Sequence, residues 1–503
     1  MSFDTGQLAL SSPLLAVALG GLLVLLLEAF SVTAPRNPLG GSRAWLAVLT
    51  LLVLGIACAL DVQSWADAET PRAIYQGMYA VDRFSIFVDV VLYIGAALAV
   101  LLADGFMREH RFEFGEFYAL VLLGTAGMVI LVHANDLVTL FIGLETMSLA
   151  VYVLTGSWRR SARSSEAAMK YFLVGAFASA LLIYGIALVY GVSGTSNLTS
   201  LGALASTGTQ SGITAQPLFL IGSFLIIAAL GFKIAAVPFH MWAPDAYEGA
   251  PTPVTAFMAA AVKAAGFATL LRLFAVAYGR PSLTFGAGGW ASITAVLAIL
   301  TMTIGNLSAL RQDNVKRMLA WSSIAHAGYL LIGVVAMARV GEEARGPVLY
   351  YLLAYTLTTA GSFGIVAWFG SHGDERQHLD DWAGMASRHP AAALAMTVLL
   401  LSLGGFPPTA GFFAKFYVFR VALGQQGLVP LVIIAIANSL ISVFYYLRVV
   451  TAMYFREPGR AVTPIHAPGM TAALIIATLG TLGLGLAPGW VVELAGKATL
   501  LVK

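Results

Sequence analysis

Four ionisable side chains stand well inside long apolar stretches of the sequence, where a charged group is costly. They are Glu145 in NDLVTLFIGLETMSL, Lys233 in GFKIAAVPFHMW, Lys263 in PTPVTAFMAAAVKAAG and Lys415 in GGFPPTAGFFAKF. Burial in an apolar medium disfavours the charged forms of Glu and Lys, so such groups can gain or lose a proton near neutral pH. These residue types indicate proton binding and transfer. The alternative is a set of static buried ion pairs, or polar contacts that fix the register of helices.

A buried histidine is a further candidate for proton transfer, and motifs for binding cofactors are absent from the sequence. His326 lies inside an apolar stretch, SSIAHAGYLL, where a side chain with an ordinary pKa near 6.5 is suited to relay protons. A hydrogen-bonded core histidine is the alternative. The sequence holds no G-x-x-x-x-G-K-[ST] phosphate loop and no G-x-G-x-x-G after a strand, and its one cysteine, Cys58, cannot hold an iron–sulfur cluster. We therefore expect no cofactor in this chain, and we expect any driving energy to arrive from a partner.

The composition requires a membrane protein. Of 503 residues, 59% are hydrophobic and 11% are charged, whereas soluble domains carry about 25% charged residues. Water-soluble enzymes and nucleic-acid binders are excluded. We predict an all-α polytopic membrane protein in the lipid bilayer with about 14 transmembrane helices. The stretches that are long enough to span are 10–30, 44–61, 84–103, 116–133, 136–156, 168–191, 217–246, 251–276, 289–310, 318–338, 347–370, 391–420, 427–453 and 469–488.

The basic residues predict an orientation. If the N-terminus is outside, the inside segments carry 14 Lys and Arg residues and the outside segments carry 7. Cytoplasmic loops are rich in Lys and Arg, so this topology is favoured and places both termini outside. Four further basic residues, Lys170, Arg272, Arg420 and Arg448, lie nearer the ends of spans. We expect them to extend toward the headgroups.

Two spans carry a helix-breaking proline near a lysine. Lys233 precedes Pro238 by five residues, and Lys415 follows Pro407-Pro408 by seven residues. Broken helices at membrane depth are tolerated where they line protein or water, and a matched pair of them in two halves indicates an inverted-repeat transporter. The two spans lie five apart, so they cross in opposite directions, as an inverted repeat requires. Chance is the alternative, because proline is common in transmembrane helices.

At this point the motifs above, together with WAPDAYEGAPTPVTAF, resemble a known family. It is the antiporter-like membrane subunits of NADH–quinone oxidoreductase, respiratory complex I, and the nearest branch is subunit N. The resemblance covers nearly the whole chain. The sister subunit L continues into a long amphipathic helix, and subunit M has a glutamate where Lys415 stands. The shorter motifs are shared with multisubunit cation/proton antiporters.

The resemblance implies a division of the chain and a set of partners. The expected parts are 1–115 with three N-terminal helices, 116–276 and 289–453 as two inverted five-helix repeats, each with a broken helix, and 469–503 with the last helix and tail. The expected partners are other membrane subunits of complex I, namely the sister subunit M and small subunits. The expected place is the bacterial inner membrane, with both termini on the periplasmic side.

The resemblance also implies a role for each buried residue. Glu145 and Lys233 would form the coupled pair of the proton-uptake half, and Lys263 would carry the proton toward the midline. His326 would relay it, and Lys415 would be the terminal donor or acceptor. The chain would be a non-redox, proton-translocating subunit driven by quinone reduction in partner subunits. Three rivals stay open: a subunit of a cation/proton antiporter, a structural spacer, and a stand-alone transporter.

Overall fold

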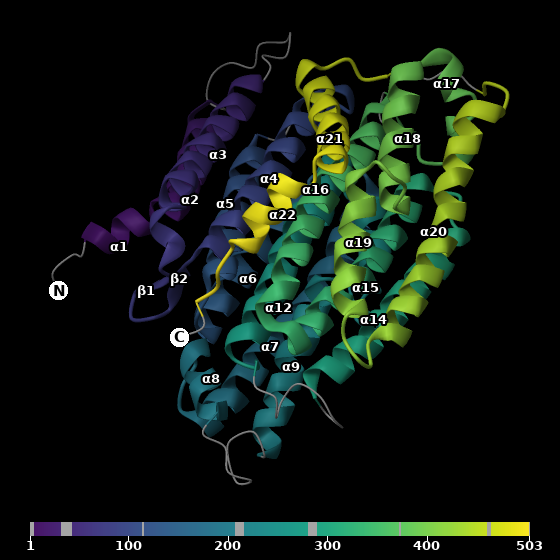
Figure 1. The fold of residues 1–503 in the computed structure, drawn as a ribbon. Helices are drawn as coiled ribbons and strands as arrows, with labels where there is room; N and C mark the ends of the chain where they lie inside the picture. The colour runs from purple at the N-terminus through teal and green to yellow at the C-terminus, as the bar shows by residue number, and fades with distance from the viewer. Residues whose placement is uncertain are drawn as a thin grey trace.

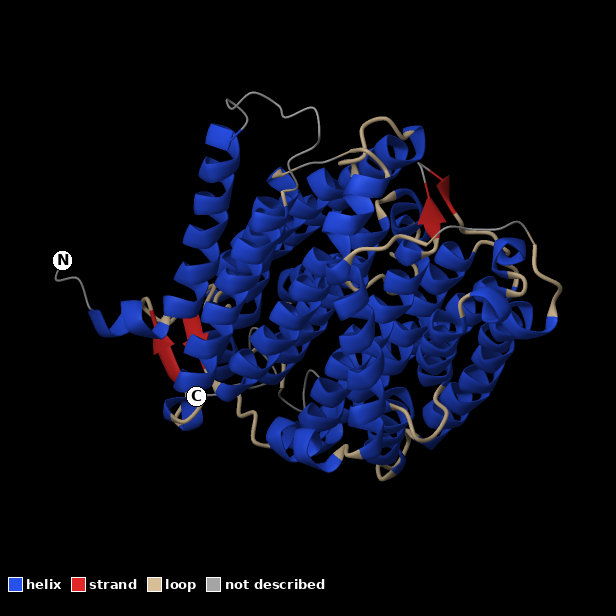
Figure 2. Cartoon of the chain, turned by 90° about the horizontal axis from the view of Figure 1, so that it is seen from above, coloured by secondary structure: helices blue, strands red, loops and turns tan. Residues whose placement is uncertain are grey.

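The computed structural model describes residues 5–31, 43–112, 115–206, 216–279, 289–371, 374–459 and 464–501. In these ranges the chain is almost entirely helical, and the helices run side by side across one slab (Figure 1). The strands form two short antiparallel hairpins on the periphery, at opposite sides of the molecule (Figure 2). An all-α polytopic membrane protein is therefore confirmed.

The N-terminal part stands at one side of the bundle, where α2 and α3 pack on each other and on α5. Many leucines of α2 face outward, as expected for a helix in contact with lipid. Its elements are α1 (Thr5–Leu10), α2 (Ser12–Ser31), α3 (Ala44–Ser64), a 3₁₀ turn (Asp67–Glu69), β1 (Arg72–Ile74), β2 (Tyr79–Val81) and α4 (Arg83–Glu109).

The next part contains the first broken helix. Here α9 ends at Lys233, and α10 begins after the irregular stretch 234–241 that holds Pro238. The elements are α5 (Glu116–His133), α6 (Leu137–Thr155), α7 (Ala162–Ser193), α8 (Leu198–Ser206), α9 (Pro217–Lys233), α10 (Trp242–Gly249), α11 (Thr252–Phe257), a π-helical segment (Met258–Val262) and α12 (Lys263–Val276). The π-helical segment directly before Lys263 has no signature in the sequence.

The last part contains the second broken helix, in which α18 ends at Gly404 and α19 begins at Ala410 after Pro407 and Pro408. The elements are α14 (Trp290–Leu310), α15 (Val315–Val340), a 3₁₀ turn (Gly341–Ala344), α16 (Arg345–Trp368), β3 (Gly370–Ser371), β4 (Asp374–Glu375), a 3₁₀ turn (Leu379–Trp382), α17 (Met385–Arg388), α18 (Pro390–Gly404), α19 (Ala410–Leu423), α20 (Val429–Phe455), α21 (Pro468–Leu486) and α22 (Gly489–Gly496).

Every apolar stretch expected to span coincides with a helix or with the two pieces of a broken helix. In the described residues, 11 helical runs are long and apolar enough to cross a membrane, and one of them, Val315–Trp368, contains both α15 and α16. Two shorter apolar helices, Pro217–Lys233 and Pro390–Gly404, are the first pieces of the broken spans. Both breaks are thus confirmed, while the number 14 and the domain boundaries stay predictions. Of the basic residues used for orientation, Arg36, Arg280, Arg460 and Lys503 lie outside the described residues.

The first helix pair of each expected half crosses at glycines. A Cβ on Gly143 of α6 would lie 2.5 Å from the Leu131 backbone nitrogen of α5. A Cβ on Gly328 of α15 would lie 2.5 Å from the Met302 backbone nitrogen of α14. The absence of a side chain lets the two backbones touch, as small residues do in membrane helix packing. An internal repeat would produce this shared crossing.

These crossings generate a prediction about stability. Gly328→Ala forces a methyl group into backbone, and overpacking of this kind costs about 1–3 kcal/mol. We expect the thermal unfolding midpoint of the purified protein to fall. Gly55→Ala on α3 is the matched control, because a Cβ there meets nothing within 4 Å. Equal midpoints for the two variants would contradict the close crossing.

Candidate functional site

The three central lysines and His326 are buried. Lys233, Lys263, Lys415 and His326 are exposed by 3%, 2%, 5% and 3%. In the described part of the chain, none of the three lysines forms an ion pair; their amino groups bond hydroxyl and carbonyl oxygens instead. Glu145 is only half-buried. The structure therefore places these residues inside the bundle with neutral partners.

Lys233 sits in an aromatic cage at the end of α9. Its Nζ lies 3.4 Å from the Tyr152 hydroxyl and 5.2 Å and 5.5 Å from the ring centres of Tyr152 and Tyr171. Ring faces stabilise an ammonium group through their quadrupole. The hydroxyl of Tyr152 rests on Gly175 of α7, where a Cβ would come within 1.9 Å of it. Gly175 thus makes room for the only side-chain oxygen that Lys233 contacts among the described residues.

Glu145 does not touch Lys233 in this structure. It lies on α6, seven residues before Tyr152 and therefore on the same helix face, and its Oε1 accepts a short hydrogen bond from the Ser179 hydroxyl of α7. Its charge still acts on Lys233. The two groups are not in direct contact, and the coupled pair stays a prediction.

Lys263 contacts residues of the second expected half of the chain. It is the first residue of α12 after the π-helical segment, and its Nζ donates to the Ser323 carbonyl at 2.6 Å and bonds the Ser323 hydroxyl. The Tyr355 ring centre lies 5.7 Å away. Ser323 belongs to α15, so this contact joins the end of the first expected half to the second.

His326 lies one turn further along α15. Its Nδ1 is 2.6 Å from the Tyr351 hydroxyl of α16, and its Nε2 is 3.3 Å from the Tyr446 hydroxyl of α20. Tyr446 also shares a short hydrogen bond with Ser322, the neighbour of Ser323. The charges of both Lys263 and Lys415 act on the imidazole. His326 therefore lies between the two lysines, in a set of hydroxyl groups that can donate and accept.

Lys415 takes its partners from the break in its own span. Carbonyls normally accept from the N–H four residues later, and proline has no N–H. Pro407 and Pro408 thus leave the carbonyls of Leu403 and Gly404 without helical donors, and Lys415 Nζ donates to them at 2.9 Å and 3.0 Å. A third bond of 2.9 Å goes to the Ser439 hydroxyl. The Pro407-Pro408 motif therefore creates the carbonyl acceptors that bind the Lys415 amino group.

Lys415 also borders a cavity of 380 Å³ between α19 and α20. The lining is mostly apolar, with Phe412, Phe416 and Leu440, and it includes the second basic residue Arg420. This cavity gives a buried amino group a path toward the outside of the bundle.

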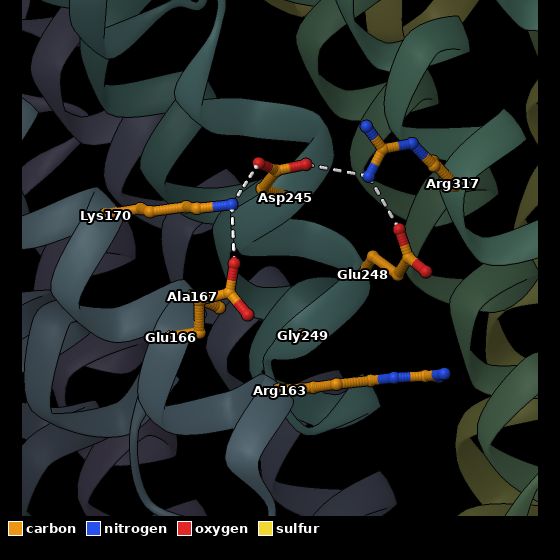
Figure 3. Close-up of a pocket in the computed structure, with 8 residues that line it drawn as sticks. All are labelled: Arg163, Glu166, Ala167, Lys170, Asp245, Glu248, Gly249 and Arg317. Carbon is orange, nitrogen blue, oxygen red and sulfur yellow. Dashed lines mark hydrogen bonds and ion pairs between the residues drawn. The ribbon is translucent and has the colours of Figure 1, made fainter.

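A charged pocket of 190 Å³ lies near the start of α7 and α15 (Figure 3). Lys170 Nζ is 2.7 Å from Glu166 and 2.9 Å from Asp245, and Arg317 bonds Asp245 and Glu248 at 2.8 Å and 2.6 Å. Glu166 and Lys170 are an i,i+4 pair, but Asp245 lies too far in sequence from both Lys170 and Arg317 for local patterns to reveal these contacts. Lys170 is half-exposed, and its extension toward the headgroups stays a prediction.

The same expectation is wrong for Arg272. Its side chain is exposed by 1%, and its guanidinium bonds Asp82 at 2.9 Å, the Ser85 hydroxyl at 2.6 Å and the Val132 carbonyl at 2.8 Å. A carboxylate partner within the bundle replaces the headgroup. Arg420 is exposed, and Arg448 pairs with Asp313, as residues near span ends do.

Comparison with known proteins identifies the family. Residues 134–442 match the family model described as NADH:quinone oxidoreductase/Mrp antiporter, TM. NADH-quinone oxidoreductase subunit N 1 of Sorangium cellulosum is 47% identical, over 97% of this chain and 98% of the relative. The subunit N of Trichlorobacter lovleyi is 42% identical, over 99% and 98%. This chain belongs to the subunit N family.

Solved structures agree with this membership. A chain of respiratory complex I from Thermus thermophilus with bound aureothin matches at 34% identity and a TM-score of 0.78, over 96% of this chain and 99% of that chain. A chain of the Mrp complex from Dietzia sp. matches at 23% identity and a TM-score of 0.81, over 97% and 96%, which shows a shared fold. In this subunit N relative, the described residues hold no group of three or more His, Cys, Asp or Glu side chains placed to bind a metal ion.

A buried pair between the first turn of α15 and β4, which lies outside the spans, fixes the position of α11 and α15. Lys316 Nζ is 2.9 Å from Glu375 of β4, and its side chain is fully buried. Glu375 also accepts a 2.8 Å hydrogen bond from Thr252, the first residue of α11. Burial alone would raise the pKa of Glu375, but the Lys316 charge and these hydrogen bonds hold it below its ordinary value.

We expect Glu375→Gln to lower the thermal midpoint strongly, because it leaves the buried Lys316 charge unpaired; breaking a buried pair costs about 3–5 kcal/mol. The pKa of Glu375 is lowered in the folded state, so its stabilisation exists above its ordinary pKa and is lost as pH falls through the lowered pKa. The difference between wild type and variant therefore shrinks in acid. Glu493→Gln, which removes an exposed pair with Lys497, is the control. A difference that persists unchanged in acid would contradict the role of the pair.

Proposed function

We propose that this chain is the proton-translocating, non-redox membrane subunit of an NADH–quinone oxidoreductase, driven by quinone reduction in partner subunits. One observation carries the proposal: the three buried lysines each bond a serine or tyrosine hydroxyl and no carboxylate among the described residues, and His326 lies among further hydroxyl groups on α15, α16 and α20. Family membership at 47% identity supports it. The chain itself carries proton-transfer groups and would bind no cofactor.

Each group of the series has a role in this proposal. Glu145, half-exposed on α6, senses a charge change in a neighbouring subunit and passes it across Tyr152 to Lys233. Lys263, Ser323 and His326 carry the proton through the centre, and Lys415 exchanges it at the second half.

The rivals are less well supported. A structural spacer would pair its buried lysines with carboxylates, as Lys316 and Arg272 are paired, but the described part of the chain offers none to the three central lysines. A cation/proton antiporter subunit shares the fold, and the Mrp likeness at 23% identity is consistent with that alone. The subunit N relatives cover nearly the whole chain, which favours the oxidoreductase.

Location and partners follow from the proposed function. The chain would lie in the bacterial inner membrane with both termini on the periplasmic side. It would contact the sister subunit M and small membrane subunits of the complex, through faces that carry exposed apolar side chains. Leu440 and Phe444 of α20 and Phe177 of α7, exposed by 69%, 65% and 64%, are examples.

The central test removes the amino groups. In membranes that carry Lys233→Ala or Lys415→Ala, we expect the complex to assemble while NADH–quinone turnover and proton pumping fall together, by tenfold or more as for loss of a proton-transfer group. Glu145→Gln should lower both in the same way. Lys497→Ala, at an exposed pair, is the control and should leave both unchanged. Full pumping in the assembled Lys233 and Lys415 variants would sink the proposal in favour of a structural spacer.

A second test removes the Tyr446 hydroxyl, which lies within hydrogen-bond distance of both Ser322 and His326. Tyr446→Phe removes that hydroxyl but retains the packing of the ring, so we expect slower pumping and turnover at unchanged assembly. Tyr350→Phe is the matched control, because its buried hydroxyl bonds only the Leu484 carbonyl among the described residues. Equal losses in both variants would mean that the effect comes from stability and not from proton transfer.

A further inference from the structure

A second cluster of buried titratable groups lies apart from the lysine series, where His133 contacts β2 of the β1–β2 hairpin. Asp61 of α3, Asp89 of α4 and His133 of α5 are exposed by 2%, 0% and 3%. The Tyr93 hydroxyl donates to Asp61 Oδ2 at 2.9 Å, and His133 Nε2 lies 2.7 Å from Asp89 Oδ2. Three helices thus bring two carboxyl groups and an imidazole together.

The hydrogen bonds of His133 fix how many protons the pair holds. Nδ1 lies 2.7 Å from the Ala80 carbonyl, which can only accept, so Nδ1 carries a hydrogen. The 2.7 Å contact between Nε2 and Asp89 Oδ2 needs a further proton, on either the imidazole or the carboxyl group. Asp89 and His133 therefore share one proton beyond the Nδ1 hydrogen, and the pair has no net charge in either arrangement.

Asp61 is then the excess charge of the cluster. The other buried carboxylate nearby, Asp82, is matched by Arg272 at 2.9 Å. Among the described residues Asp61 hydrogen-bonds only the Tyr93 hydroxyl, and the charge of Asp89 acts on it. Two carboxylates that interact in an apolar interior do not both ionise readily, so one keeps a proton. The groups that face this site from the surrounding elements are Cys58, Tyr75, Tyr79, Asp82, Tyr93 and Arg272.

A buried oxygen atom of Asp89 also lacks a hydrogen-bond donor in the described part of the chain, which again indicates a bound proton. Asp89 Oδ1 is fully buried and has no hydrogen-bond partner among the described residues. A buried acceptor without a donor is costly, and a proton between the two carboxyl groups would satisfy it. Tyr93 lies one turn after Asp89 on α4, so the Asp61 that it binds lies on the same side of α4 as this atom.

We propose that Asp61, Asp89 and His133 form one proton-binding site, distinct from the Glu145, Lys and His326 series. Asp61 takes a proton from water, the proton passes between Asp61 and Asp89, and Asp61 returns it to water, so no other reactant is needed. Arg272 connects this site to α12: its Nε donates to the carbonyl of Val132, next to His133, and it lies nine residues after Lys263. A role in pumping rests on the proposed function, whereas protonation itself does not.

The experiment is infrared spectroscopy of the purified complex. We expect a carboxylic-acid C=O stretch in wild type at neutral pH that is lost in Asp61→Asn and changed in Asp89→Asn. Asp380→Asn, which removes a carboxylate exposed by 92%, should leave that band in place. Wild-type spectra that differ from both cluster variants only in ionised carboxylate bands would overturn the proposal, because both groups would then be charged.

A conservative variant covers the case in which Asp61→Asn fails to assemble. Asp61→Glu retains a carboxyl group, so the C=O band should shift in frequency rather than disappear, and its intensity should titrate with pH. A band identical to that of wild type would show that Asp61 is not the protonated group, and would overturn the assignment. The spectra report the protonation of the carboxyl groups and do not require turnover. Their outcome is therefore independent of the outcome of the pumping test.

Discussion

The cost of a charge away from water governs the whole arrangement. Each buried basic group in this chain must find oxygen atoms or ring faces, because the membrane interior offers no water to solvate it. Lys415 shows how the chain meets this demand. Two successive prolines withhold two backbone donors, and the carbonyls left over bind the amino group of a lysine one helix piece further on. The helix break and the buried charge are one structural unit.

Buried basic residues fall into two kinds according to their partners. Arg272 and Lys316 meet Asp82 and Glu375 directly, so removing a proton from either would leave a buried carboxylate without its counter-charge. These pairs join distant segments and hold the bundle together. Lys233, Lys263 and Lys415 meet hydroxyls, carbonyls and rings, which remain satisfied or nearly so when the lysine is neutral. Neutral partners are what allow a lysine to release a proton cheaply.

The sequence predicts the parts of this design that are local. Apolar stretches, the proline breaks beside Lys233 and Lys415, and the buried positions of Lys263 and His326 can all be read within short windows. Contacts between distant segments cannot. Tyr446 beside His326, Ser323 beside Lys263 and Asp82 beside Arg272 come from residues separated by 60 to 190 positions. A serine or tyrosine in the sequence is also a poor indicator of a proton-transfer site, because both residues are common in membrane helices for reasons of packing.

The expectation for Arg272 failed for a related reason. Nearness to a span end agrees with the half-exposed side chain of Lys170, but it does not reveal that Asp82, directly before α4, lies against the end of α12. The coupled Glu145–Lys233 pair stays a prediction, and what the sequence does not show is that the Lys233 amino group bonds the Tyr152 hydroxyl, which rests on Gly175. The two opposite charges are not in contact and yet within electrostatic reach. A direct pair would hold the proton on Lys233; a separated pair lets the state of Glu145 change how firmly it is held.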